Sequence, residues 1–159
     1  MQIRNSALQH GTETVVVRLF NTYGPGEYYS PYRSVNCRFL YCALHGLPWT
    51  VFRGHSRTST YLADTVRTVA NISENFRPGE TYNIGGTDLH TIEELSNVVL
   101  EVTGADSRLV HYQESEILTT KLKRVDTSKS VRDLDHKNSY SLAAGMKLTS
   151  DWMRHVYRL

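Results

Sequence analysis

Three consecutive valines, Val15 to Val17, lead into the sequence "RLFNTYGPGE" at residues 18–27. A strand with one face in water alternates apolar and polar residues, whereas a parallel strand covered on both faces is apolar at successive positions. Residues 12–20 are therefore expected to form a covered parallel strand. This strand breaks at a Gly-Pro-Gly turn, beside an amide (Asn21) and a phenol (Tyr23).

Apolar periodicity and capping residues divide the rest of the chain into alternating helices and strands. Helices are expected at the beginning of the chain up to Gly11, over 34–46, 61–75, 91–104 and 125–134, and after Ser141; strands are expected over 49–53, 80–86 and 108–112. The helix over 61–75 carries Leu62, Val66, Val69 and Ala70 on one stripe, which predicts its inward face. This alternation indicates the α/β class.

Size and composition exclude several classes of function. The 159 residues suggest a single unit over 1–159, and the net charge of +2 argues against a nucleic-acid or membrane-surface partner. Cys37 and Cys42 lie five residues apart and point to different sides of a helix, so neither a disulfide nor a metal site is expected. Without an apolar run of membrane-spanning length or a signal peptide, the chain is expected to be cytoplasmic.

Polar residues and glycines follow three of the expected strands, at Asn21, at Arg57 in "FRGHSRTSTYLAD", and at Asn83 in "TYNIGG". Ligands of open α/β sheets bind over the carboxyl ends of strands, and arginines with hydroxyl groups suit phosphate. A phosphorylated small molecule is therefore expected. Each residue also has a purely structural explanation: Asn21 in its own turn, Tyr23 in packing, Arg57 on the surface, and Gly85–Gly86 in the backbone.

The order of five motifs distinguishes these alternatives. The succession "RLFNTYGPGE", "GHSRTSTYLADTVR", "PGETYNIGG", "VDTSKSVRDL" and "LAAGMKLTSDWM" resembles the C-terminal half of the NAD-dependent epimerase/dehydratase family, whose members are extended short-chain dehydrogenases acting on nucleotide sugars. The resemblance implies the last strands of a doubly wound Rossmann-type parallel sheet plus a small α/β substrate-binding lobe. In that sheet, the strands at 12–20 and 80–86 would be parallel neighbours.

The resemblance also implies roles for individual residues. Phe20 would lie near the nicotinamide of NAD, Asn21 would bind the diphosphate or sugar, and Arg57 would clamp the diphosphate. Tyr23 and Asn83 are expected at the same substrate site, with Arg33 and Lys121 as secondary contacts. Asn21, Tyr23 and Arg57 are expected to converge on one cleft.

Two parts of the family's machinery do not occur in these 159 residues: a glycine-rich turn for the NAD pyrophosphate, and a Tyr-x-x-x-Lys pair. The chain is therefore expected to be the substrate-binding portion, without the NAD-binding portion, catalytic residues or NAD binding of its own. It would bind a nucleoside-diphosphate sugar and be inactive alone. The alternative is a stand-alone module for nucleotide-sugar binding or assembly. Because the valine-rich strand would leave an open edge, a homo-oligomer is expected.

Overall fold

A computed structural model of the chain describes residues 2–114 and 119–159, and it confirms the α/β class. Its helices are α1 (Gln2–His10), α2 (Val35–Leu44), α3 (Leu62–Asn75), α4 (Ile92–Thr103), α5 (Ser128–Leu134) and α6 (Leu142–Tyr157), with a 3₁₀ turn at Ser107–Leu109. Its strands are β1 (Val16–Leu19), β2 (Thr22–Tyr23), β3 (Trp49–Phe52), β4 (Ser56–Thr58), β5 (Thr60–Tyr61), β6 (Thr81–Ile84), β7 (Leu89–Thr91) and β8 (Val110–Gln113). No helix in the described part of the chain is long and apolar enough to cross a membrane.

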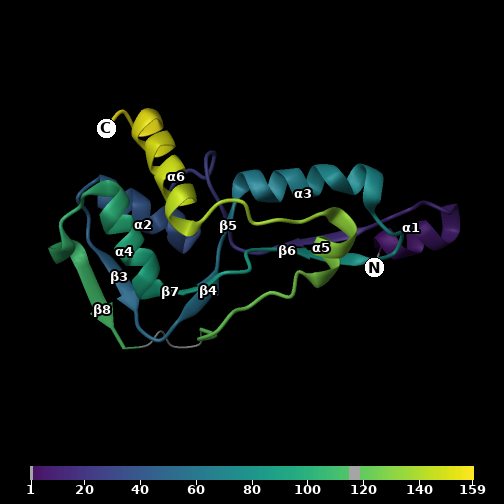
Figure 1. Ribbon diagram of the computed structural model, residues 1–159, viewed down its shortest axis with the longest axis horizontal. Coiled ribbons are helices and arrows are strands. Elements are labelled where there is room, and N and C mark those ends of the chain that lie inside the picture. The colour runs from purple at the N-terminus through teal and green to yellow at the C-terminus, as the bar shows by residue number, and fades with distance from the viewer. Residues whose placement is uncertain (1, 115–118) are drawn as a thin grey trace.

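The strands pair two by two (Figure 1). β1 and β6 are parallel, with Val17 opposite Tyr82, which confirms the predicted neighbours. β2 pairs in parallel with β5, and β3 with β8, whereas β4 and β7 are antiparallel. Figure 1 shows β1, β6, α3 and α5 at one end of the molecule, and β3, β8, α2, α4 and α6 at the other.

The main core lies at the second of these ends, where α2, α4 and α6 pack against one another, and α2 and α4 also pack against β3. Local signals in the sequence define two of these helices. Thr91 and Glu94 form a capping box at the beginning of α4, and Ser141 caps α6 through its side chain. Met146 and Met153, which lie seven residues apart on one face of α6, are fully buried. The core is therefore built from the apolar faces that helical periodicity identifies.

The expected cover of β1 is incomplete. Val16 and Val17 are half-buried and Leu19 is exposed, and β1 pairs only with β6 among the described strands. Leu8, on α1, is 86% exposed. The described residues therefore cover only part of the apolar surface that three consecutive valines led us to expect.

The predicted inward face of α3 is wrong. Val66 and Val69 of the apolar stripe are exposed, and the buried side chains of this helix are Asp64, Thr65 and Thr68. The apolar periodicity of α3 does not mark its packed face because the polar face finds partners elsewhere in the chain.

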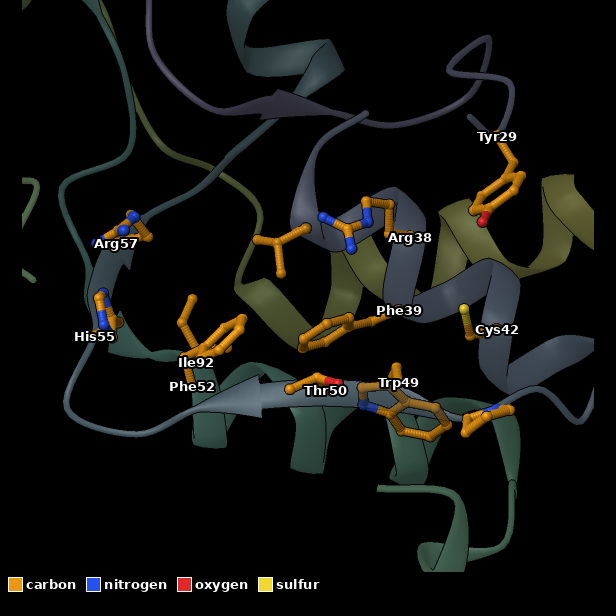
Figure 2. A pocket seen from close by; sticks show the side chains of 12 residues that line it. Tyr29, Arg38, Phe39, Cys42, Trp49, Thr50, Phe52, His55, Arg57 and Ile92 are labelled. Atoms are coloured by element: carbon orange, nitrogen blue, oxygen red, sulfur yellow. The ribbon is translucent and has the colours of Figure 1, made fainter. Parts of the chain in front are cut away.

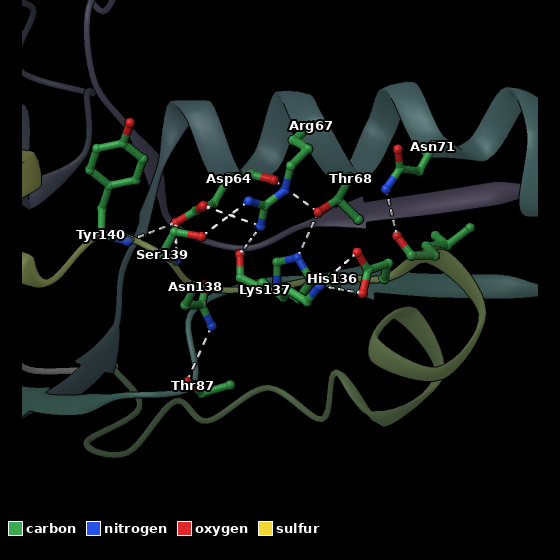
Figure 3. A network of polar contacts seen from close by, with 12 residues as sticks. Asp64, Arg67, Thr68, Asn71, Thr87, His136, Lys137, Asn138, Ser139 and Tyr140 are labelled. Carbon is green, nitrogen blue, oxygen red and sulfur yellow. Dashed lines mark hydrogen bonds and ion pairs between the residues drawn. The ribbon is translucent and has the colours of Figure 1, made fainter.

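Those partners lie in the segment before α6 and are drawn in Figure 3. The Asp64 carboxylate accepts hydrogen bonds from the backbone N–H groups of Ser139 (2.9 Å) and Tyr140 (3.2 Å). The Thr68 hydroxyl lies 2.8 Å from His136 Nδ1, and His136 Nε2 lies 2.9 Å from the Gly85 carbonyl oxygen. Buried polar groups are tolerated when they are hydrogen-bonded in this way.

Candidate functional site

A cavity of about 330 Å³ lies among α2, β3 and the beginning of β4 (Figure 2). Its volume is in the range typical of small-molecule sites. Two arginines, Arg38 and Arg57, line it together with His55, and none of the lining residues within 2–114 and 119–159 is a carboxylate. The remaining lining is mainly apolar and aromatic: Tyr29, Val35, Phe39, Cys42, Pro48, Trp49, Thr50, Phe52 and Ile92. A positively charged cavity with flat apolar walls suits an anion that carries an apolar or aromatic group.

One face of α2 forms a wall of this cavity. Val35, Arg38, Phe39 and Cys42 are three or four residues apart, which places them on the same side of a helix. The N-terminus of α2 is fixed by Ser34, whose hydroxyl accepts a hydrogen bond from the Cys37 N–H. Burial raises the pKa of the Cys42 thiol, so this cysteine is a protonated wall residue at neutral pH.

The facing wall comes from β3. Trp49 is buried, and its indole N–H donates to the Ser96 hydroxyl over 3.0 Å, which fixes the ring against α4. Thr50 and Phe52 are half-buried and line the cavity. Figure 2 shows Phe39, Trp49 and Phe52 in the middle of the site, between Arg57 at one end and Tyr29 at the other.

Arg57 comes to the cavity on β4. Its Nη1 donates to the carbonyl oxygens of Ser56 (2.8 Å) and Lys121 (3.0 Å). The Ser56 N–H also donates to the Lys121 carbonyl, over 2.7 Å, so the segment at Lys121 runs beside β4. His55, the residue before β4, is buried and lies at the same end of the cavity. The sequence thus places a guanidinium in a defined orientation at a polar cavity end.

Asn21 is connected to the strand that carries Arg57, although it does not line the cavity. Its side-chain N–H₂ donates to the Thr58 carbonyl oxygen over 2.8 Å, and its own carbonyl accepts from the Thr60 N–H over 3.1 Å. The amide therefore bonds to a segment 37 residues away and not to its own turn. The side chain of Asn21 is exposed.

The expected convergence of Asn21, Tyr23 and Arg57 on one cleft is wrong for Tyr23. Tyr23 is a core residue with 3% of its surface exposed, and its hydroxyl donates to the Leu142 carbonyl over 3.4 Å. Burial, with the nearby Tyr61 and Asp64, raises the pKa of this phenol, so it stays protonated. The packing explanation for this tyrosine is the one that the structure supports.

Three other expected substrate contacts lie outside the cavity among the described residues. Arg33 is exposed beside the Gly-Pro-Gly turn, at a shallow hollow of its own. Asn83 donates to the Asp126 carbonyl over 3.0 Å and thereby joins β6 to the segment before α5. Lys121 is exposed and reaches Arg57 through its backbone oxygen. Residues 115–118, in the polar stretch just before Lys121, lie outside the described residues.

Phe20 and the two glycines after β6 form a close backbone contact. A Cβ atom on Gly85 would lie 3.0 Å from Phe20 Cβ, and one on Gly86 would lie 2.2 Å from the Ser59 carbonyl oxygen. These glycines thus let the end of β6 approach Phe20 and the segment after Arg57. Phe20 is half-buried there, and its carbonyl accepts from the Thr60 hydroxyl over 3.2 Å.

Sequence reasoning missed Arg38, Tyr29 and Phe52 as lining residues. One signal was available: Arg38 is a charge on a helix face that is otherwise apolar, between Val35 and Cys42. No local sequence signal marks Tyr29 as a lining residue, because its position depends on a contact with Tyr157 at the end of α6. The Tyr29 N–H donates to the Tyr157 hydroxyl over 3.0 Å, and the Tyr29 ring stacks on Tyr41 at 3.8 Å.

Comparison with known proteins identifies the family. The family model "NAD dependent epimerase/dehydratase family" matches residues 1–85. The chain belongs to this family. It is 30% identical over 158 residues to a UDP-N-acetyl-alpha-D-glucosaminuronate decarboxylase of Bacillus cytotoxicus. This alignment covers 94% of this chain and 49% of the relative. It is 29% identical over 153 residues to a dTDP-glucose 4,6-dehydratase of Streptomyces griseus, and this alignment covers 95% of this chain and 45% of the relative.

Solved structures of family members have the same fold. A UDP-glucose 4-epimerase of Thermotoga maritima with UDP-glucose has a TM-score of 0.87 and 27% identity, over 99% of this chain and 51% of that one. A dTDP-glucose 4,6-dehydratase of Streptomyces venezuelae with NAD bound has a TM-score of 0.81 and 26% identity, and the superposition covers 96% of this chain and 47% of that one. The chain thus spans about half the length of the curated relatives and solved structures that it matches.

Proposed function

We propose that this chain is the nucleotide-sugar-binding part of a NAD-dependent nucleoside-diphosphate-sugar epimerase or dehydratase. The cavity among α2, β3 and β4 would hold the nucleoside diphosphate. The observation that carries this proposal is the position of Arg57, a guanidinium at the polar end of a cavity whose described walls are mainly apolar and aromatic. The relatives' names, which include UDP- and dTDP-sugars, support the same class of ligand.

The geometry of Arg57 suits a diphosphate. Its Nη1 is engaged by two backbone carbonyls, which fix the plane of the guanidinium before a ligand arrives. A planar guanidinium binds phosphate oxygens through parallel, charge-assisted hydrogen bonds. The ligand's base would then extend along the apolar walls towards Tyr29.

Titration of the purified chain with UDP and dTDP tests this proposal. Hydrogen bonds to charged groups contribute about 1.5–3 kcal/mol, so Arg57→Gln should weaken binding of both nucleotides by roughly 10- to 150-fold. Arg108→Gln is the matched control, because Arg108 is highly exposed and pairs only locally with Asp106. Binding by the parent chain that Arg57→Gln leaves unchanged would refute the assignment.

We propose further that these 159 residues bind the substrate without converting it. They contain no glycine-rich turn for a dinucleotide and no Tyr-x-x-x-Lys pair, and Phe20 is the one residue assigned towards NAD. The chain's own residues therefore do not fit a complete NAD site. Turnover of a UDP- or dTDP-sugar by the purified chain with added NAD would contradict this. The alternative, a stand-alone binding or assembly module, predicts the same lack of turnover.

We propose, finally, that the chain self-associates as a homo-oligomer. One edge of β1 is unpaired among the described strands. Large apolar side chains are also exposed on three elements: Leu8 on α1, Leu19 on β1, and Val66 and Val69 on α3. An open edge and bare apolar side chains are the usual features of a surface that pairs with another chain. Sedimentation at low micromolar concentration tests this, and a monomer of 18.2 kDa there would refute it.

A further inference from the structure

Two tyrosines that follow the Gly-Pro-Gly turn are attached to the C-terminal helix, α6. The Tyr29 N–H donates to the Tyr157 hydroxyl over 3.0 Å, and the Tyr28 ring meets the Trp152 ring edge-on at a centroid distance of 5.4 Å. Of these four residues, only Tyr29 is among the described residues that line the cavity. One end of the cavity is therefore fixed by a helix that contributes no described lining residue.

The Tyr29 ring also belongs to a stack. Tyr41 of α2 lies 3.8 Å from the Tyr29 ring at an interplanar angle of 10°, and 3.9 Å from the His45 ring at 26°. The Tyr157 ring stands edge-on to Tyr41 (5.2 Å) and to His45 (5.5 Å). Edge-on pairs are favourable, whereas rings stacked face to face are less so and depend on other contacts to hold them. Tyr157 supplies such contacts, through its ring edge and through its hydroxyl. We call Tyr29, Tyr41, His45 and Tyr157 the aromatic clamp.

The segment that carries Tyr29, residues 27–34, is closed at its base. The Glu27 carboxylate accepts from the Ser34 N–H (2.9 Å) and from the Ser34 hydroxyl (2.8 Å). Gly24 and Gly26, just before this segment, have φ values of 148° and 93°, a backbone conformation that glycine adopts readily. The segment is thus a compact loop that is tied to α2 at its base and to α6 through its tyrosines.

We infer that Tyr157 is a positioning residue, which holds Tyr29 in place at the end of the cavity opposite Arg57. Binding of a ligand long enough to reach from Arg57 to Tyr29 then depends on α6. This inference rests on the proposed function, since it takes the ligand to be a nucleoside diphosphate. It goes further by coupling the site to a helix outside it, and coupling is reciprocal: a ligand that requires the closed clamp also stabilises the clamp.

UDP and inorganic pyrophosphate distinguish this role from a general effect on the fold. Pyrophosphate can bind at Arg57 without reaching Tyr29, which lies at the other end of the cavity (Figure 2). Tyr157→Phe keeps the ring and removes only the hydroxyl. A neutral hydrogen bond contributes about 0.5–1.5 kcal/mol, so this variant should bind UDP about two- to tenfold more weakly and pyrophosphate unchanged. Arg57→Gln should weaken both ligands. Tyr112→Phe is the matched control, because it removes a hydroxyl from a half-exposed ring on β8.

Amide hydrogen exchange gives a second measurement, at the donor itself. Without ligand, the Tyr29 amide should exchange about two- to tenfold faster in Tyr157→Phe than in the parent chain. UDP should slow this exchange in the parent chain.

The outcomes separate the two proposals. If UDP does not bind the parent chain, the proposed function is wrong and this inference is wrong with it. If Tyr157→Phe weakens UDP and pyrophosphate by the same factor, or weakens neither, the proposed function stands and the positioning role of Tyr157 is refuted. A Tyr29 amide whose exchange UDP leaves unchanged would refute the coupling whatever the affinities.

Discussion

The contact between Gly145 and Tyr23 allows a quantitative test of the fold. Gly145 lies in the first turns of α6, and a Cβ atom there would be 2.2 Å from the Tyr23 hydroxyl oxygen and 3.0 Å from Tyr23 Cζ and Tyr61 Cδ2. Alanine in a helix is more favourable than glycine by about 1 kcal/mol. Overpacking of a core costs about 1–3 kcal/mol. The clash should therefore exceed the helical gain at this position.

At 2.2 Å the overpacking cost should lie in the upper part of its range, about 2–3 kcal/mol. After subtraction of the helical gain of about 1 kcal/mol, we expect Gly145→Ala to lower the free energy of unfolding by about 1–2 kcal/mol. For a chain of this length, the loss corresponds to a fall in Tm of roughly 2–8 °C. The same substitution in the Tyr23→Phe background should be nearly neutral, because the atom at 2.2 Å is then gone. Tyr23→Phe alone should cost little, since its hydrogen bond to Leu142 is long at 3.4 Å.

Urea unfolding followed by tryptophan fluorescence measures all four proteins of this double-mutant cycle. We expect a coupling free energy of about 1–2 kcal/mol between the two positions. Tyr61→Phe is the matched control: the Tyr61 atom near Gly145 is a ring carbon, so its combination with Gly145→Ala should be additive. Additive effects of Gly145→Ala and Tyr23→Phe would refute the packing of Tyr23 under α6.

Three further predictions concern stability. Gly86→Ala should lower the free energy of unfolding by about 3 kcal/mol, the upper end for overpacking. Its Cβ would lie 2.2 Å from the Ser59 carbonyl oxygen, which is backbone and not a side chain that can move. The urea midpoint of this variant measures the loss. Asp135 has a φ of 49°, so Asp135→Gly should relieve left-handed strain and raise stability by about 0.5–1 kcal/mol in the same assay. Hydrogen bonds from Arg132 and Tyr82 lower the pKa of Asp133 to about 2. Since the unfolded carboxyl titrates near pH 4, the stability that depends on Asp133 should be complete above pH 4 and decline between about pH 4 and pH 2. Asp133→Asn should remove this part of the pH dependence.

Elements with local signals could be predicted from the sequence. The parallel character of β1 follows from consecutive valines, whereas its pairing with β6 follows from the family resemblance. The beginnings of α4 and α6 follow from Thr91 and Ser141 as caps. The buried methionines of α6 follow from helical spacing. In each case the deciding interaction lies within a few residues of the signal, or depends on apolar periodicity alone.

Elements decided by distant partners could not be predicted. The face of α3 that packs is set by the hydrogen bonds of Asp64 to Ser139 and Tyr140, about 75 residues further along the chain. Tyr23 is buried because Gly145 leaves room for its ring, a contact that neither residue indicates alone. The role of Arg57 at a cavity depends likewise on α2 and β3, which bring the opposite walls.

Asn21 explains how the end of β1 contributes to the cavity without lining it. Its φ of 45° is unfavourable for most residues, and asparagine tolerates the left-handed region better than others. In this conformation its side chain bonds to Thr58 and its carbonyl accepts from Thr60, on both sides of Ser59. Glycine would accept the same φ but would lose the bond to Thr58, the residue directly after Arg57. A residue with both an amide and tolerance for positive φ is therefore the one that joins the strand end to the arginine.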